Sequence, residues 1–151
     1  MMVMNPVRQF MTEVVTTIEP TRTALDAATV MTEKGRGCLV VVNQDRKPVG
    51  ILTERDFVRR IIKENLSPAG VRVSSFMSTP LVTISPEASI YEAAKTMVEH
   101  KVRRLPVLET GRLVGIITAT DFAKFLGWDT DKKKIDPDMI IKAMIRYYCL
   151  Q

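Results

Sequence analysis

Two four-residue patterns combine a hydroxyl group with a carboxylate at a spacing that suits phosphate and sugar chemistry. Thr53-Glu54-Arg55-Asp56 and Thr118-Ala119-Thr120-Asp121 each follow a short apolar run that begins with glycine. If a strand ends and a helix begins at the threonine, the unpaired N–H groups of the first helical turn, together with the hydroxyl, can bind a phosphate. The aspartate carboxylate can accept hydrogen bonds from both hydroxyls of a ribose.

The same residues also have a purely structural interpretation. Threonine at the N-cap and aspartate at the third helical position both favour a helix start, through a side-chain hydrogen bond and through the helix macrodipole. Such a cap contributes about 1 kcal/mol to helix stability. Capping and ligand binding are compatible, so the two patterns alone do not separate them.

Arginines precede a buried apolar run in each half of the chain. Arg36-Gly37-Cys38 leads into the first run, and Val102-Arg103-Arg104 leads into the second. A planar guanidinium can donate two parallel hydrogen bonds to a phosphate. The adjacent Arg103 and Arg104 therefore indicate an anion site, and Arg55 is a further phosphate candidate. A single surface arginine needs no ligand to explain it.

These groups lie within an internal repeat. Residues 10–61 align with residues 76–126 with one gap at Asp45, and 17 of the 51 aligned pairs are identical. Each copy predicts the order strand, helix, strand, strand, helix, and the whole predicts a mixed α+β fold. One such copy buries little apolar surface alone, so the two copies are expected to share a core.

Helical patterns mark the helix starts and one buried face. Ser89 with Glu92 three residues later forms a capping box, and Thr23 with Asp26 forms a weaker one. The helix after Ser89 has an apolar stripe expected to face the core, made of Ile90, Ala93, Ala94, Met97 and Val98. Short apolar runs at 39–42 and 105–108 predict buried strands, each followed by a hairpin partner.

A final helix is predicted after the second copy, where Asp136 is the expected N-cap and Pro137 the first helical residue. Its apolar face comprises Ile140, Ile141, Met144, Ile145, Tyr147 and Tyr148. We expect this helix to pack on the repeats or across a subunit boundary. Docking of a separate target protein is the alternative.

Composition narrows the class of protein. The 151 residues carry a net charge of +5 with one histidine and two distant cysteines, so a metal site and an enzymatic nucleophile–base pair are not expected. The basic charge favours anionic partners. No apolar run has the roughly 20 residues of a membrane helix, and the N-terminus shows no secretory signal, so a cytoplasmic protein is expected.

The repeated unit, above all its stretch HKVRRLPVLETGRLVGIITATD at 100–121, resembles a tandem pair of cystathionine-β-synthase (CBS) domains, a Bateman module. The resemblance implies two β-α-β-β-α repeats packed about a pseudo-twofold axis. It divides the chain into an N-terminal segment 1–9, repeat one at 7–66, repeat two at 71–126, and a linker and C-terminal helix at 127–151.

The resemblance also implies a ligand and its contacts. Clefts between CBS repeats bind adenosyl compounds such as AMP, ADP, ATP or S-adenosylmethionine, with the threonine and aspartate of each motif holding phosphate and ribose. The second-strand entrances flank the clefts, and the segments before the first strands wall the adenine. The implied residues are Thr53, Asp56, Thr118, Asp121, Gly37, Cys38, Arg103, Arg104, Met11 to Val14 and Met77 to Pro80. The paired arginines are expected to favour the more highly phosphorylated ligand.

The expected function is a stand-alone, non-enzymatic sensor that binds an adenosyl ligand as a regulator, not as a catalytic cofactor. It would signal to a target protein, and a homodimer is the expected signalling form. Two alternatives remain open. One is an interaction module in which both motifs serve only as helix caps, and the other is a nucleic-acid-binding protein, suggested by the positive charge.

Overall fold

The protein consists of two compact units, each built around one repeat. The computed structural model describes residues 5–127 and 136–149, with side chains up to Arg146. The first unit comprises residues 15–81, and the second combines residues 82–151 with the N-terminal segment 1–14. Each is described by itself. Within the described residues, no helix has the length and apolar character needed to cross a membrane.

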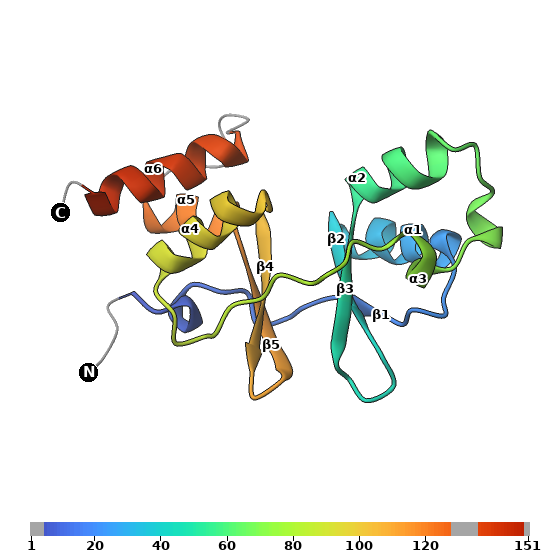
Figure 1. Ribbon diagram of the computed structural model, residues 1–151, viewed down its shortest axis with the longest axis horizontal. Coiled ribbons are helices and arrows are strands. Elements are labelled where there is room, and N and C mark those ends of the chain that lie inside the picture. The colour runs from blue at the N-terminus through green and yellow to red at the C-terminus, as the bar shows by residue number, and fades with distance from the viewer. Residues whose placement is uncertain (1–4, 128–135, 150–151) are drawn as a thin grey trace. The chain divides into compact units, whose positions relative to one another are not determined.

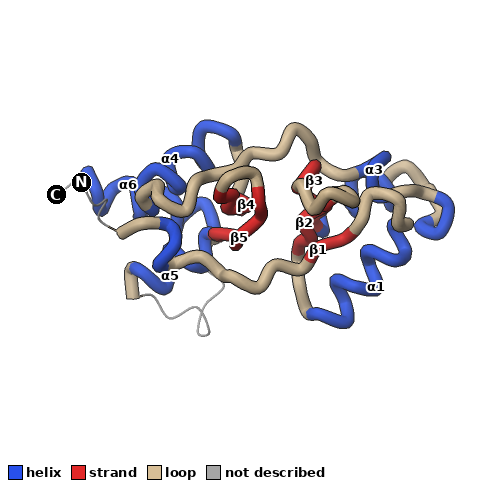
Figure 2. Tube along the Cα trace, turned by 90° about the horizontal axis from the view of Figure 1, so that it is seen from below, coloured by secondary structure: helices blue, strands red, loops and turns tan. Residues whose placement is uncertain are grey.

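The first unit contains a three-stranded sheet with helices gathered on one side of it (Figures 1 and 2). Strand β2 pairs in parallel with β1 and antiparallel with β3. Helix α2 continues directly into a π-helical turn. The elements are β1 Thr17–Ile18, α1 Ala24–Lys34, β2 Cys38–Val42, β3 Pro48–Thr53, α2 Glu54–Phe57, the π-helix Val58–Ile62, a 3₁₀ helix Pro68–Gly70 and α3 Val73–Phe76.

The second unit repeats this order around the antiparallel hairpin of β4 and β5. Its expected first strand is reduced to one parallel bridge between Ile84 and Val107. The elements are a 3₁₀ helix Val7–Gln9, α4 Ile90–His100, β4 Arg104–Glu109, β5 Arg112–Thr118, α5 Ala119–Phe125 and α6 Pro137–Cys149. The predicted mixed α+β fold with two β-α-β-β-α repeats and a C-terminal helix is confirmed.

Both predicted capping boxes form. In α1 the Asp26 N–H donates to Thr23 Oγ1 at 3.1 Å, and the Thr23 N–H donates to the Asp26 carboxylate at 3.0 Å. In α4 the corresponding distances between Ser89 and Glu92 are 3.1 and 3.3 Å. Each pair satisfies two N–H groups that the first helical turn leaves without partners, which fixes where the helix begins.

The predicted stripe of α4 is correct except at its edge. Ile90, Ala93, Ala94 and Met97 are buried in the core of the second unit, whereas Val98 is 50% exposed. Val98 is the member of the stripe that lies farthest round the helix from Met97 and Ile90, because successive residues turn by about 100°. It therefore falls at the solvent boundary.

Helix α6 covers the helical face of the second unit. It packs against α4 and α5 (Figure 1), and Ile140, Ile141 and Met144 join their core. Asp136 accepts the Asp138 N–H at 3.0 Å, as expected of an N-cap. The expectation that this helix packs on the repeats is confirmed for those residues, while the side chains of Tyr147 and Tyr148 lie outside the described part of the chain.

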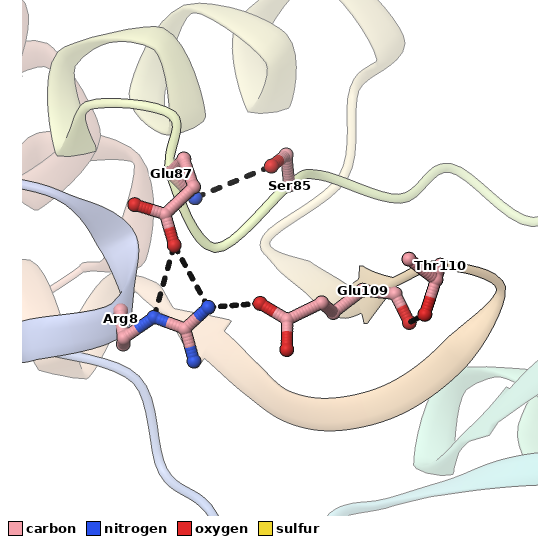
Figure 3. Close-up of polar contacts among 5 residues, drawn as sticks. All are labelled: Arg8, Ser85, Glu87, Glu109 and Thr110. Carbon is pink, nitrogen blue, oxygen red and sulfur yellow. Dashed lines mark hydrogen bonds and ion pairs between the residues drawn. The ribbon is translucent and has the colours of Figure 1, made fainter.

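The N-terminal segment belongs structurally to repeat two. The N–H of Val7 donates to Ala88 O at 2.7 Å, and that of Arg8 to Pro86 O at 2.9 Å. The Arg8 guanidinium pairs with both Glu87 and Glu109 (Figure 3). The hydrogen bonds to the two carboxylates raise the pKa of Arg8 above its ordinary value, and the bond to Glu87 contributes more than the bond to Glu109. Because the ion pairs are exposed, their contribution to stability is small.

Candidate ligand-binding site

Both threonine–aspartate motifs stand at the junction of a strand and a helix, and both are built in the same way. The Asp56 Oδ2 atom accepts the Thr53 N–H at 2.9 Å and the Thr53 hydroxyl at 3.2 Å. In the second unit Asp121 Oδ2 accepts the equivalent groups of Thr118 at 2.8 and 3.2 Å. Each aspartate is only 5% exposed. The carboxylates thus fix the N-termini of α2 and α5, and the structural role of these residues is real whether or not they also bind a ligand.

The second-strand entrance lies beside each motif. In the first unit Cys38 is the strand partner of Thr53, and the Glu54 N–H donates to Gly37 O at 3.3 Å. In the second unit Arg104 is the strand partner of Thr118, and the Ala119 N–H donates to Arg103 O at 3.2 Å. Antiparallel pairing therefore brings these predicted residues together within each repeat, although they are 14 or more positions apart in sequence.

The methionines of the predicted adenine wall contact Gly50 and Gly115. These two glycines stand three residues before Thr53 and Thr118, and we call them the motif glycines. A Cβ atom added at Gly50 would lie 2.7 Å from the Met77 sulfur, and one added at Gly115 would lie 2.6 Å from the Met11 sulfur. Backbone bridges between Ile51 and Ser78 and between Ile116 and Thr12 hold these segments in place. Each motif glycine is required because another segment of the chain packs where a side chain would be.

Two further residues contact the first motif: Ser78, which belongs to the predicted adenine-wall segment Met77 to Pro80, and Arg60, which was not predicted. Ser78 Oγ donates to Asp56 Oδ1 at 2.8 Å, and Arg60 Nε lies 3.9 Å from the same oxygen. The Arg60 guanidinium also donates to Phe76 O and Met77 O, at 3.0 and 2.9 Å. Arg60 stands four residues after Asp56 on the same helical face, which is a signal the sequence did contain.

The second motif differs at the corresponding position, where the alignment places Phe125 instead of arginine. The Phe125 ring meets Phe10 edge to face, with 5.3 Å between the ring centroids. Burial raises the pKa of Asp121 above its ordinary value, against the hydrogen bonds from Thr118 and the charge of Lys124, which lower it. The two carboxylates thus share a hydrogen-bond pattern but differ in their charged surroundings.

The remaining predicted residues lie nearby or on the surface. Arg103 is paired with Asp138 of α6 at 3.2 Å. Val102 and Arg104 are half-buried, Arg36, Arg55, Thr120 and Pro80 are exposed, and Val14 is 75% exposed. The predicted set divides evenly by unit: Arg36, Gly37, Cys38, Thr53, Arg55, Asp56, Met77 and Pro80 belong to the first, and Met11, Val14, Val102, Arg103, Arg104, Thr118, Thr120 and Asp121 to the second.

An open hollow of about 450 Å³ lies between α1 and α2 of the first unit. Its lining includes Ala28, Met31, Thr32, Arg36, Phe57 and Val58. We call it the α1–α2 groove. Thr53 and Asp56 do not line it, whereas Glu54 of the motif and the predicted residues Arg36 and Gly37 do. Among the described residues, no three His, Cys, Asp or Glu side chains are grouped so as to hold a metal ion.

Comparisons with known proteins agree with this construction. The model of the CBS domain matches residues 7–63 and 73–127. An uncharacterized protein of Methanopyrus kandleri is 40% identical over 108 residues, which cover 71% of this chain and 55% of that protein. The chain therefore spans about half the length of that relative.

Two further relatives are matched over most of their length. The CBS domain-containing protein YhcV of Bacillus subtilis is 36% identical over 120 residues, or 80% of this chain and 84% of that protein. Hypoxic response protein 1 of Mycobacterium tuberculosis is 34% identical over 123 residues, or 82% of this chain and 86% of that protein. A crystal structure of hypoxic response protein I with two coordinated zinc ions has a TM-score of 0.72 at 33% identity, covering 80% of this chain and 98% of that one.

Family-model matches over both repeats, relatives of this identity and the shared fold lead to one conclusion. The chain belongs to the CBS-domain family and carries two CBS domains in tandem, a Bateman module.

Proposed function

We propose that the protein binds an adenosyl ligand, such as AMP, ADP, ATP or S-adenosylmethionine, at its threonine–aspartate motifs and signals its occupancy to a target protein. The observation that carries the proposal is that both motifs keep the same strand-to-helix construction, with a buried carboxylate bonded to the threonine.

Each residue has a distinct part in this proposal. The N–H groups at the start of α2 and α5, with the threonine hydroxyls, favour an anionic phosphate. The aspartates accept ribose hydroxyls. In the first unit Ser78 already donates to Asp56 Oδ1, so a ribose must compete with the Ser78 hydroxyl for that atom. Arg104, the strand partner of Thr118, supplies a guanidinium beside the second motif.

Thermal unfolding in the presence of AMP, ADP, ATP and S-adenosylmethionine tests the proposal. A micromolar ligand binds with about 8 kcal/mol, and at a hundredfold excess over its dissociation constant it adds about 2.7 kcal/mol of apparent stability. We expect at least one of these compounds to raise the melting temperature, and isothermal titration calorimetry to give its stoichiometry. No shift with any of them would refute the proposal.

Matched variants separate binding from capping. Asp56→Asn and Asp121→Asn keep an oxygen that can accept the threonine N–H but weaken the acceptor for ribose. We expect each to lower affinity at its own motif about tenfold or more. Ser78→Ala, which removes the competing donor, is expected to leave affinity at the first motif unchanged or increased. Unaltered affinity in both asparagine variants would count against the ribose role.

The second candidate is a protein-interaction module that binds no nucleotide. It is favoured by the hydrogen bonds that already engage both carboxylates and by their exposure of only 5%. On this account the asparagine variants lower the melting temperature, and none of the four compounds changes it. Signalling itself further requires that the ligand bind one conformation more tightly than another.

A further inference from the structure

One arginine of the predicted phosphate-binding set already has an anionic partner. Arg103 Nε donates to Asp138 Oδ1 at 3.3 Å, and Arg103 Nη2 donates to Asp138 Oδ2 at 3.2 Å. Two parallel hydrogen bonds to two oxygens of one anion are also the arrangement in which a guanidinium binds a phosphate. The carboxylate of Asp138, in the first turn of α6, therefore engages the same donors that a ligand phosphate would use.

Arg103 lies beside the second threonine–aspartate motif. The N–H of Ala119, inside the motif, donates to Arg103 O at 3.2 Å, and the next residue, Arg104, is the strand partner of Thr118. All of these residues, with Asp138, belong to the second unit. The main chain of Arg103 thus contacts the motif while its side chain contacts α6. A guanidinium that pairs with Asp138 is not available to a phosphate at the motif.

The Arg103–Asp138 pair is of a kind that a ligand can displace. The two side chains are 41% and 53% exposed, and both hydrogen bonds are longer than the roughly 2.7–2.9 Å typical of charge-assisted bonds. Exposed ion pairs contribute little to stability, because water screens the charges and both side chains lose conformational freedom. Helix α6 is held mainly by Ile140, Ile141 and Met144 in the core of the unit. Opening the pair therefore changes the availability of Arg103 and leaves the fold intact.

The first unit has no equivalent of this pair. In the repeat alignment Gly37 stands at the position of Arg103, and Cys38 stands at the position of Arg104. A carboxylate elsewhere in the chain can therefore limit the supply of guanidinium donors at the second motif but not at the first. The chain thus contains its own internal comparison for the role of Asp138.

We propose that Asp138 is a specificity-determining residue for the second motif. By holding Arg103, it makes a ligand phosphate compete with a carboxylate for one guanidinium, and so lowers the preference of the motif for ATP over uncharged adenosyl ligands. Binding of ATP is then coupled to opening of the Arg103–Asp138 pair, and the coupling is reciprocal. This inference rests on the proposed adenosyl binding and adds to it the residue that sets the response to the number of phosphates.

Affinities for ATP and for adenosine, measured by isothermal titration calorimetry, test this role. The variants are made in an Asp56→Asn background, which weakens the first motif so that the second is measured. Asp138→Asn removes the competing charge at nearly constant side-chain size. We expect the affinity for ATP to rise about two- to fivefold, the range that an exposed ion pair allows, and the affinity for adenosine to stay unchanged.

Matched variants make the test specific. Asp136→Asn removes an equal charge two residues away, where the carboxylate accepts the Asp138 N–H and does not contact Arg103. It should leave the ratio of ATP affinity to adenosine affinity unchanged. Arg103→Ala should lower the affinity for ATP, and adding Asp138→Asn to it should have no further effect. In an Asp121→Asn background, which reports the first motif, Asp138→Asn should change neither affinity.

Nuclear magnetic resonance of the nitrogen-15-labelled chain follows the pair directly through the Arg103 Nε–H signal. We expect Asp138→Asn to shift this signal in the ligand-free chain. In the unaltered chain ATP should shift it and adenosine should not, because only ATP offers phosphates to the guanidinium. Circular dichroism checks that all variants fold.

The possible outcomes separate this inference from adenosyl binding itself. If the chain binds adenosyl ligands but Asp138→Asn leaves the affinity ratio unchanged, or Asp136→Asn raises it equally, the role of Asp138 is refuted and adenosyl binding stands. A rise that persists in Arg103→Ala would assign the effect to net charge and would also overturn the inference. If no variant binds ATP or adenosine, the proposed function fails, and this inference fails with it.

Discussion

The two units have the same sequence plan, yet within the described residues only the second has a further helix packed over its helical side. In repeat two, α5 contains the buried residues Phe122 and Ala123, and α6 packs over this helix. Repeat one has Phe57 and the exposed Val58 at the same positions. Duplication produced two equivalent faces, and the C-terminal helix covers one of them. The difference shows that one repeat pattern can build a helical face that a further helix covers and another that no described helix covers.

The methionine-containing segments that lie beside the two motifs are held by different chemistry. In the first unit Arg60 donates to the carbonyls of Phe76 and Met77. In the second, Phe125 packs edge to face against Phe10. Both contacts place a methionine against the motif glycine. A polar clamp and an aromatic contact are thus interchangeable for positioning, but only the clamp places a cation near the aspartate.

The largest expected effect tests whether α6 is an integral part of the second unit. Met144→Ala removes a fully buried side chain, and such substitutions cost about 3 kcal/mol of unfolding free energy through lost burial and the cavity left behind. Val58→Ala on the open face should change it by less than about 0.5 kcal/mol. Urea denaturation followed by circular dichroism measures both. Equal effects would mean that the two faces do not differ as described.

Substitutions of the motif glycines are expected to have an intermediate effect on the free energy of unfolding. Gly115→Ala and Gly50→Ala each force a Cβ against a methionine, and overpacking of this kind costs about 1–3 kcal/mol. We expect the larger loss at Gly115, because the Thr12 carbonyl oxygen lies 2.9 Å from the added atom, compared with 3.2 Å for the Ser78 oxygen at Gly50. Backbone atoms yield less readily than a flexible methionine.

Pairing these substitutions with Met11→Ala and Met77→Ala sharpens the comparison. If the clash with the methionine dominates, each double variant should recover part of the loss, with a coupling energy of about 0.5 kcal/mol or more. Additive losses at both sites would show that the methionines are not the obstacle, and would leave the backbone contacts as the cause.

The smallest expected effect is a dependence of the folding stability on pH through Asp121. Because burial raises the pKa of Asp121 in the folded state, the carboxyl stabilises the fold most when protonated. This contribution is fully present below the ordinary aspartate pKa of about 3.9 and is lost as the pH rises through the raised value. Asp121→Asn has no such titration. Its stability relative to the unaltered chain should therefore increase as the pH rises across that interval.

Parallel melting curves of the unaltered chain and Asp121→Asn, from pH 3.5 upward in about half-unit steps, measure this change. A difference in stability that stays constant with pH, or that moves in the opposite direction, would contradict the assignment of a raised pKa.

Local sequence signals determined much of this protein. The capping pairs at Thr23 and Ser89, the N-cap at Asp136, the hairpins and the duplicated order follow from short-range hydrogen bonding and apolar periodicity, which act over a few residues. The resemblance of the stretch around Asp121 to CBS domains identified the family. The dipeptides Phe10-Met11 and Phe76-Met77 align as identities between the two copies, and so do Gly50 and Gly115. The sequence alone did not show that these methionines contact these glycines.

Only the tertiary structure decided which segments meet. That Met11 packs on Gly115 and Met77 on Gly50, so that the segment before repeat one completes repeat two, depends on contacts between residues remote in sequence. The same holds for α6, whose apolar stripe predicted burial without saying against what. An amphipathic pattern fixes which face of a helix avoids water, whereas the choice of partner depends on which complementary surface the folded chain brings within reach.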